Sequence, residues 1–187
     1  MKPTFTILLA LCLCLTGCRE KPQTLTLKEK AEGGDAEAQS MLGFDYETGL
    51  GGEKQDPKEA VKWYQKAAEQ GFAEAQHNLG FMYIEGRGVE QNSKEAAKWF
   101  RKAAEQGDEG GQKWLGMMYE FGDGVEKNYV TAKMWHDFAA AKGVDEDWLE
   151  EHKSNIAKKM TPDQIAKAEE LSKEMIKKNP KLIKKKE

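Results

Sequence analysis

Apolar residues in the middle of the chain recur at helical spacing and define two successive helices. Between residues 72 and 85, apolar side chains spaced i, i+4, i+7 and i+8 share one helix face: Ala75, Leu79, Met82 and Tyr83. Gly86 and Gly88 interrupt this stripe. A second apolar stripe then follows: Ala96, Trp99, Phe100, Ala103 and Ala104. The pattern predicts a pair of amphipathic helices joined by a glycine-containing turn.

The same unit returns on both sides of this segment at a nearly constant interval. Trp63, Trp99 and Trp135 are 36 residues apart, and the first copy has one extra residue between Gly51 and Asp56. A period in this range is typical of repeat proteins, and the extra residue is expected in a loop. We therefore predict an all-α solenoid with three helix-turn-helix repeats over residues 35–143.

Small polar residues and glycines mark the ends of the predicted helices. Asp56, Asn92 and Asn128 precede the second helix of each copy, where they can accept hydrogen bonds from its first N–H groups. Gly107 follows a second helix, where a left-handed residue is commonly needed. A glycine in a helix costs about 1 kcal/mol relative to alanine. One nevertheless recurs inside each first helix, at Gly43, Gly80 and Gly116, and we expect a close approach of the partner helix there.

Segments on either side of the repeats are predicted to close the ends of the array. Residues 26–34 begin with Thr26 and Glu29 in a capping-box arrangement and predict an N-terminal helical cap. Residues 144–178 keep helical spacing and contain a second such start at Thr161, so they predict C-terminal capping helices. Residues 179–187 form a lysine-rich tail, whose composition fits both contact with anionic lipid and a solvated end.

The first residues have the composition of an export signal. Residues 1–17 contain a lysine, an apolar run and small residues at the end, which is the layout of a secretory signal peptide. The segment Leu15-Thr16-Gly17-Cys18 resembles the lipobox of bacterial lipoproteins, and this resemblance implies lipidation of Cys18. Residues 18–25 would then be a short tether. Since Arg19 follows the cysteine, the resemblance implies the inner leaflet of the outer membrane, facing the periplasm of the cell envelope.

The repeated unit resembles the Sel-like repeat, a relative of the tetratricopeptide repeat. The residues of the central copy that carry the resemblance are Gly71, Ala75, Leu79, Gly80, Tyr83, Gly86, Gly88, Ala96, Trp99, Phe100, Ala103 and Ala104. The resemblance covers about residues 31–143 and implies a right-handed α-solenoid whose concave face binds another protein. Two departures stand out. Phe72 occupies the capping position of Asp35 and Asp108, and Gly110-Gly111 in the third copy predicts a locally softer helix.

Composition and motifs argue against several kinds of function. The formal net charge of the 187-residue chain is −3, so no general attraction to nucleic acid is expected. The three histidines, His77, His136 and His152, show no metal-ligand spacing, and His136 stands where Tyr64 and Phe100 stand in the other copies, which indicates packing. Serine-hydrolase motifs are absent from the sequence. We therefore predict a protein that is not an enzyme and has no catalytic residues, metal or small-molecule cofactor. The alternative is a small envelope hydrolase acting on β-lactams or peptidoglycan.

The candidate binding residues lie on the face of the first helices that points away from the apolar stripe. Spacing by four residues selects Phe44, His77, Phe81, Lys113, Met117 and Phe121. A row of exposed aromatic and methionine side chains is typical of an interface. The opposite interpretation, in which neighbouring first helices bury these side chains against each other, fits the sequence equally well.

These expectations combine into one functional hypothesis. The chain is predicted to be a lipid-anchored periplasmic interaction scaffold whose partner is another protein, either an envelope protein or a toxin. In a sharper version it is an immunity protein against a phospholipase-type toxin of a type VI system, a role of some lipoproteins that this chain resembles. Replacing Phe81 and Met117 with serine is expected to abolish partner capture while the fold stays native.

Overall fold

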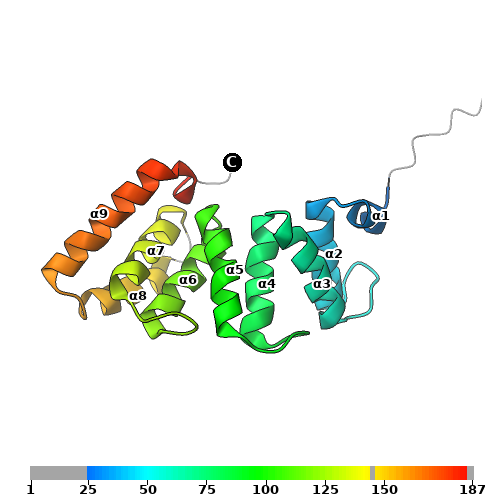
Figure 1. Cartoon of the computed structure of the whole chain (residues 1–187), viewed down its shortest axis with the longest axis horizontal. Helices are drawn as coiled ribbons and strands as arrows, with labels where there is room; N and C mark the ends of the chain where they lie inside the picture. Colours follow the sequence, from blue (N-terminus) through cyan, green and yellow to red (C-terminus); the bar gives the residue numbers. More distant parts are fainter. Residues whose placement is uncertain (1–24, 144–145, 185–187) are drawn as a thin grey trace, which may run out of the picture.

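The computed structural model describes residues 25–143 and 146–184 of the chain. Within these ranges all regular structure is helical, and no helix has the length and apolar character needed to cross a membrane. Six helices of 13 residues pack as three consecutive pairs: α2 (Ala36–Thr48) with α3 (Pro57–Glu69), α4 (Ala73–Glu85) with α5 (Ser93–Glu105), and α6 (Glu109–Phe121) with α7 (Tyr129–Ala141). Figure 1 shows them side by side, which confirms the predicted α-solenoid.

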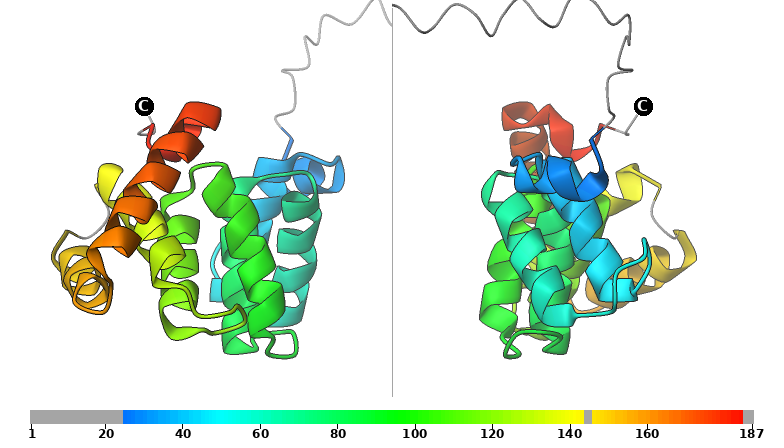
Figure 2. Two further views of the ribbon diagram at one scale, coloured as in Figure 1. Left: turned by 60° about the vertical axis from the view of Figure 1, so that its left-hand side comes forward. Right: turned by 90° about the vertical axis from the view of Figure 1, so that its right-hand side faces the viewer.

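Further helices close both ends of this array. The short α1 (Leu27–Glu32) packs on α2, and α8 (Glu146–Ala157) and α9 (Pro162–Lys178) pack on α7. A 3₁₀ turn, η1 (Pro180–Leu182), follows α9. In Figures 1 and 2, α1 and η1 lie along one edge of the array, and the glycine-containing turns after α4 and α6 lie along the opposite edge. The C-terminal ends of the first helices therefore face away from α1.

Local sequence determines where the helices begin and end. Asp56 and Asn92 each accept hydrogen bonds from two N–H groups of the turn that follows, at 3.0–3.2 Å. Gly107 has a left-handed backbone with φ of +82°, as predicted for a helix end. Phe72 is the exception, because it makes no capping hydrogen bond at the start of α4 and packs instead against the apolar cluster between α3 and α4.

The mid-helix glycines let a ring from the paired helix lie directly on the helix backbone. A Cβ atom at these glycines would be 2.7–2.8 Å from a ring atom, which is far shorter than an ordinary contact between carbon atoms. The pairs are Gly43 with Tyr64, Gly80 with Phe100, and Gly116 with His136. Each of these rings belongs to the residue that directly follows a repeated tryptophan. His136 thus packs at the position of Tyr64 and Phe100, as the sequence predicted.

In the second and third repeats, the turn between the two helices contains two glycines, and the second of them brings the turn against the preceding repeat. Gly88 has φ of +71°, and a Cβ atom there would overlap the carbonyl oxygen of Pro57 at the start of α3. Gly124, with φ of +68°, meets the carbonyl oxygen of Ser93 at the start of α5 in the same way. The turns therefore hold adjacent repeats together as well as reversing the chain.

Buried glutamines, which the sequence analysis did not identify, also tie each first helix to the helix that precedes it. Gln39 and Gln76 each donate a hydrogen bond to the C=O group eight residues earlier, at 2.9 and 3.0 Å. The side-chain amides of Gln70 and Gln106 donate in turn to Gln39 and Gln76, both at 2.7 Å. These bonds satisfy side chains that would otherwise be costly to bury.

The C-terminal segment folds back onto the array. Leu182 is only 1% exposed and packs in the apolar cluster formed by α5, α6 and α7. Its C=O group accepts a hydrogen bond from Gln112 at 2.8 Å, and the side chain of Asn179 donates one to the C=O group of Glu105 at 2.5 Å. The expectation of a solvated end therefore does not hold for residues 179–182, because a leucine among the lysines anchors them.

Candidate functional site

Three side chains on the candidate face are largely exposed. Phe44 on α2 is 48% exposed and Phe121 at the end of α6 is 58% exposed. Met41, one turn before Phe44, is 53% exposed and was not among the predicted residues. Phe44 is equivalent to Met117 of α6, and Phe121 follows Met117 by four residues, so both rings belong to the same face of the stacked first helices. Large apolar side chains are thus presented to solvent at two places on this face.

Phe81 interrupts the predicted row because it is half-buried in a cluster of rings. Its ring centroid lies 4.7 Å from that of Trp114 on α6, 5.7 Å from that of Phe100 on α5 and 5.0 Å from that of His77 on α4. Trp114 was missed by the sequence analysis. For Phe81, the structure thus matches the alternative interpretation, in which a neighbouring first helix covers the ring. A Phe81 variant would consequently disturb packing as well as any binding surface.

A surface pocket lies between α4 and α6, next to this ring cluster. It has a volume of about 200 Å³ and is lined by Ile84, Trp114, Met117, Met118, Phe121 and Asp123. Five of these six side chains are apolar, and Met117 and Phe121 belong to the predicted row. The pocket is formed at the C-terminal ends of α4 and α6, on the edge opposite α1. It has the size and apolar lining that suit one large apolar side chain of a partner.

His77 lies beneath this surface rather than on it. Its Nδ1 is 3.8 Å from the Asp108 carboxylate, and its buried Nε2 has no hydrogen-bond partner within residues 25–143 and 146–184. Gly110 makes room for the ring, because a Cβ atom there would overlap it. Burial lowers the pKa of His77, against the opposing effect of Asp108. The glycine that predicted a softer third helix therefore has a packing role beside a neutral imidazole.

Lys113 is half-buried and turns toward the C-terminal cap. Its ammonium group lies 4.0 Å from the ring centroid of Trp148 on α8. This cation–π contact joins α6 to α8 and draws the charge away from the apolar pocket.

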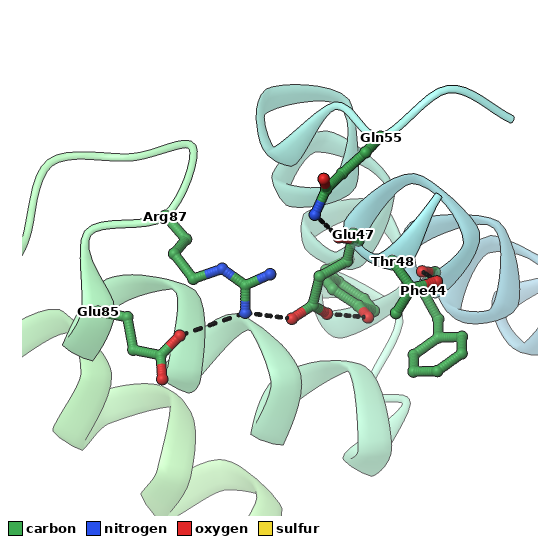
Figure 3. A network of polar contacts seen from close by, with 7 residues as sticks. Phe44, Glu47, Thr48, Gln55, Glu85 and Arg87 are labelled. Atoms are coloured by element: carbon green, nitrogen blue, oxygen red, sulfur yellow. Dashed lines mark hydrogen bonds and ion pairs between the residues drawn. The ribbon is translucent and has the colours of Figure 1, made fainter. Parts of the chain in front are cut away.

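A polar network near Phe44 connects the first two repeats. Glu47 accepts a hydrogen bond from the hydroxyl of Tyr64 at 2.7 Å and pairs with Arg87 of the next repeat at 2.8 Å. Arg87 also contacts Glu85 at 3.3 Å, and the ring of Phe44 lies to the side of these groups (Figure 3). Burial, together with this carboxylate, raises the pKa of Tyr64. The exposed ring of Phe44 thus lies near a partly buried set of charges.

Three potential metal ligands meet at the C-terminal end of the array. Glu120 on α6, His136 on α7 and His152 on α8 each offer one ligand atom, and these atoms lie within 4.8 Å of one another. Glu120 and His136 are buried. Burial lowers the pKa of His136, and the two histidines lower the pKa of Glu120 despite its own burial. Spacing along the sequence did not indicate this cluster, because its members come from three different helices.

Cys18, the predicted lipidation site, lies outside the described residues. The lipid anchor and the envelope location therefore remain predictions from the sequence.

Comparison with known proteins identifies the repeat. A family model described as the Sel1 repeat matches residues 36–72, 73–108 and 111–144, which together make up more than half of the chain. A search of curated proteins found no match.

Solved structures with the same architecture come from several bacteria. A protective antigen with an SLR fold, present in uropathogenic Escherichia coli strains, is 42% identical, with a TM-score of 0.74. The alignment covers 84% of this chain but only 33% of the antigen, so this chain spans about a third of that protein. A Sel1 repeat protein from Oxalobacter formigenes is 39% identical, with a TM-score of 0.63 and coverage of 69% of this chain and 95% of that one. Cysteine-rich protein B of Helicobacter pylori, 24% identical with a TM-score of 0.52 over 64% of this chain and 90% of its own, shares the fold.

Proposed function

Since the chain belongs to the Sel1 repeat family, we propose that it is a scaffold that binds a segment of another protein on the face carrying Phe44 and Phe121. Sel1 repeats generally mediate protein–protein interaction, and Sel1 repeat proteins are generally scaffolds without enzymatic activity. The observation that carries the proposal is the apolar pocket between α4 and α6, bordered by the exposed ring of Phe121. A partner segment with a large apolar side chain would fill this pocket and cover Phe121.

The position of the pocket fits a protein held at a membrane through its N-terminus. The tether would enter the array at α1, whereas the pocket lies at the C-terminal ends of α4 and α6 on the opposite edge. A partner bound there would sit on the side away from the lipid. We therefore propose that the chain is an envelope lipoprotein that captures its partner on the periplasmic side. Loss of labelled fatty acid from a Cys18→Ser variant would support the anchor, and equal labelling would contradict it.

Binding of a partner protein on this face can be tested by photo-crosslinking in the native host. A crosslinking residue at position 121 is expected to trap one protein, whereas the same residue at Lys98, which is exposed on α5 outside this face, is expected to trap none. The purified partner should then bind the Phe121→Ser variant at least about tenfold more weakly, because a central apolar anchor commonly contributes 2 kcal/mol or more. Circular dichroism must remain native. Equal affinity of wild type and variant would refute the proposed surface.

Within this proposal, the partner is a toxin that degrades phospholipid, and the chain protects its own cell. A neutralising protein anchored in the membrane would stand beside the substrate of such an enzyme. Co-expression of the protein with a toxin encoded next to it is expected to rescue growth, and the Phe121→Ser variant is expected not to. Continued survival of a strain lacking the protein, when mixed with toxin-producing siblings, would contradict the protective role.

A further inference from the structure

We propose that Glu120, His136 and His152 bind a divalent transition-metal ion, for which Zn²⁺ is the best match. The proposal is independent of the protein-binding function. His136 is completely buried, and neither of its ring nitrogens has a hydrogen-bond partner among the residues that the structure describes. Its Nε2 is 3.6 Å from Oε2 of Glu120, which is too long for a hydrogen bond. A buried imidazole without partners is unfavourable, and coordination to a cation would satisfy one of its nitrogens.

The equivalent positions of the other repeats show what is unusual in the third. In the first repeat the hydroxyl of Tyr64 donates to the carboxylate of Glu47 at 2.7 Å, so both groups are satisfied. In the second repeat the same two positions hold Ile84 and Phe100, which need no partner. Only the third pair, Glu120 and His136, combines two metal-ligand side chains, and there the packing does not bring them into hydrogen-bonding contact.

The third ligand comes from the C-terminal cap. Nδ1 of His152 on α8 lies 2.8 Å from Oε2 of Glu120, the same oxygen that faces His136. The ring of His152 is held by Trp148, whose centroid is 3.9 Å away. One carboxylate oxygen and two imidazole nitrogens thus converge from α6, α7 and α8.

These distances are close to those of a coordinated ion. Zinc binds imidazole nitrogen and carboxylate oxygen at about 2.0–2.2 Å, so ligand atoms around one ion are about 3–3.5 Å apart. The three ligand atoms here lie within 4.8 Å of one another. A shift of roughly 1 Å or less in each side chain would therefore create the site, and the partly exposed edge of His152 provides access for the ion.

The chemistry of the ligands selects the class of metal. Two imidazole nitrogens, which are borderline ligands, together with one carboxylate oxygen suit Zn²⁺, Co²⁺, Ni²⁺ or Fe²⁺. Ca²⁺ and Mg²⁺ prefer oxygen ligands, and two imidazoles make this set a poor site for them. Three protein ligands leave at least one coordination position for water or for a donor from a bound partner. An ion at this position would also connect α8 directly to the third repeat.

The test is metal binding by the full chain with Cys12→Ser, Cys14→Ser and Cys18→Ser in every protein compared, so that thiols cannot compete. After treatment with a chelator, calorimetric titration with Zn²⁺ is expected to show one site, and Co²⁺ to give the visible absorption of a four- or five-coordinate ion. His152→Gln and Glu120→Gln should each lower the affinity at least about tenfold. His77→Gln, in a separate ring cluster, is the matched control and should bind as the parent does.

Two outcomes would overturn the proposal. One is absence of Zn²⁺ and Co²⁺ binding by the folded parent protein, in which case the cluster is only a hydrogen-bonded contact between α6 and α8. The other is one site whose affinity is the same in both ligand variants, because the ion would then be bound elsewhere. Circular dichroism in the presence of chelator shows whether each variant is folded. Anomalous diffraction at the zinc edge, expected to place the ion about 2.0–2.2 Å from all three side chains, gives an independent reading if a variant unfolds.

Discussion

Replacing Gly88 with alanine should weaken the contact between the first two repeats far more than a comparable change in an open loop. The matched control is Gly52, which also has a left-handed backbone, with φ of +88°, but has no other atom near the position of a Cβ. At Gly88, by contrast, the Cβ would overlap the carbonyl oxygen of Pro57. The two variants therefore share the backbone penalty and differ in the collision with the preceding repeat.

The expected magnitudes follow from these two terms. A left-handed backbone costs an L-residue about 1–2 kcal/mol, so Gly52→Ala should lose about that much stability. Overpacking in a site that cannot relax adds about 1–3 kcal/mol, which brings Gly88→Ala to a loss of about 2–5 kcal/mol. The obstacle at Gly88 is backbone rather than the end of a flexible side chain, so relief requires that the turn separate from α3.

Urea unfolding followed by circular dichroism measures both losses. If the turn separates from α3, the Gly88→Ala curve should also broaden or divide, because cooperativity in a repeat array depends on contacts between neighbours. Equal losses for the two variants would refute the reasoning, since they would show that backbone conformation alone, and not the contact with Pro57, requires glycine at position 88.

Two further predictions concern burial. Leu182→Ala should lower the free energy of unfolding in urea by about 2–5 kcal/mol, because Leu182 lies in the core. Lys184 is exposed, so Lys184→Ala should change this free energy by about 0.5 kcal/mol or less. Similarly small effects of both variants would mean that the C-terminal segment is not anchored. Burial lowers the pKa of His77 in the folded protein. As the pH falls below about 6.5, the imidazole is therefore protonated in the unfolded chain before it is protonated in the folded protein. The free energy of unfolding should decrease from that pH downward. His77→Gln should reduce this decrease when unfolding free energies at about pH 7.5 and pH 5 are compared, and an unchanged pH dependence would contradict the assignment.

The helices and their order could be predicted from the sequence because the information is local. Apolar spacing, capping residues such as Asp56 and Asn92, and glycines at helix ends all act within a few residues of one another, and the repeat period then fixes how the units follow one another. The glutamines Gln39, Gln76 and Gln112 also recur with the period. Their burial could not have been inferred from that recurrence alone, because exposed lysines such as Lys62 and Lys98 recur with the same period.

The features that remained unpredicted depend on contacts between distant parts of the chain. Whether Phe81 is exposed is decided by Trp114 on the next first helix, at a position that Met41 and Asn78 occupy in the other copies. The cluster around Glu120 requires a side chain from α8, outside the regular repeats. Periodicity describes what the repeats share, so it gives no information on positions where one copy differs and meets a unique neighbour.

The returning C-terminal turn changes how the array would respond to force. Along the repeats most contacts join neighbours, so a chain pulled from its ends can lose one helix pair at a time. The hydrogen bonds of Asn179 with Glu105 and of Gln112 with Leu182 connect residues 74 and 70 positions apart and close a large loop around α6 to α9. Residues inside this loop are shielded from the pulling force until these contacts break, whereas the described residues around the first repeat show no such closure. Under tension the molecule would therefore unravel from its N-terminal side, and α6, which supplies most of the lining of the apolar pocket, would be released after α4.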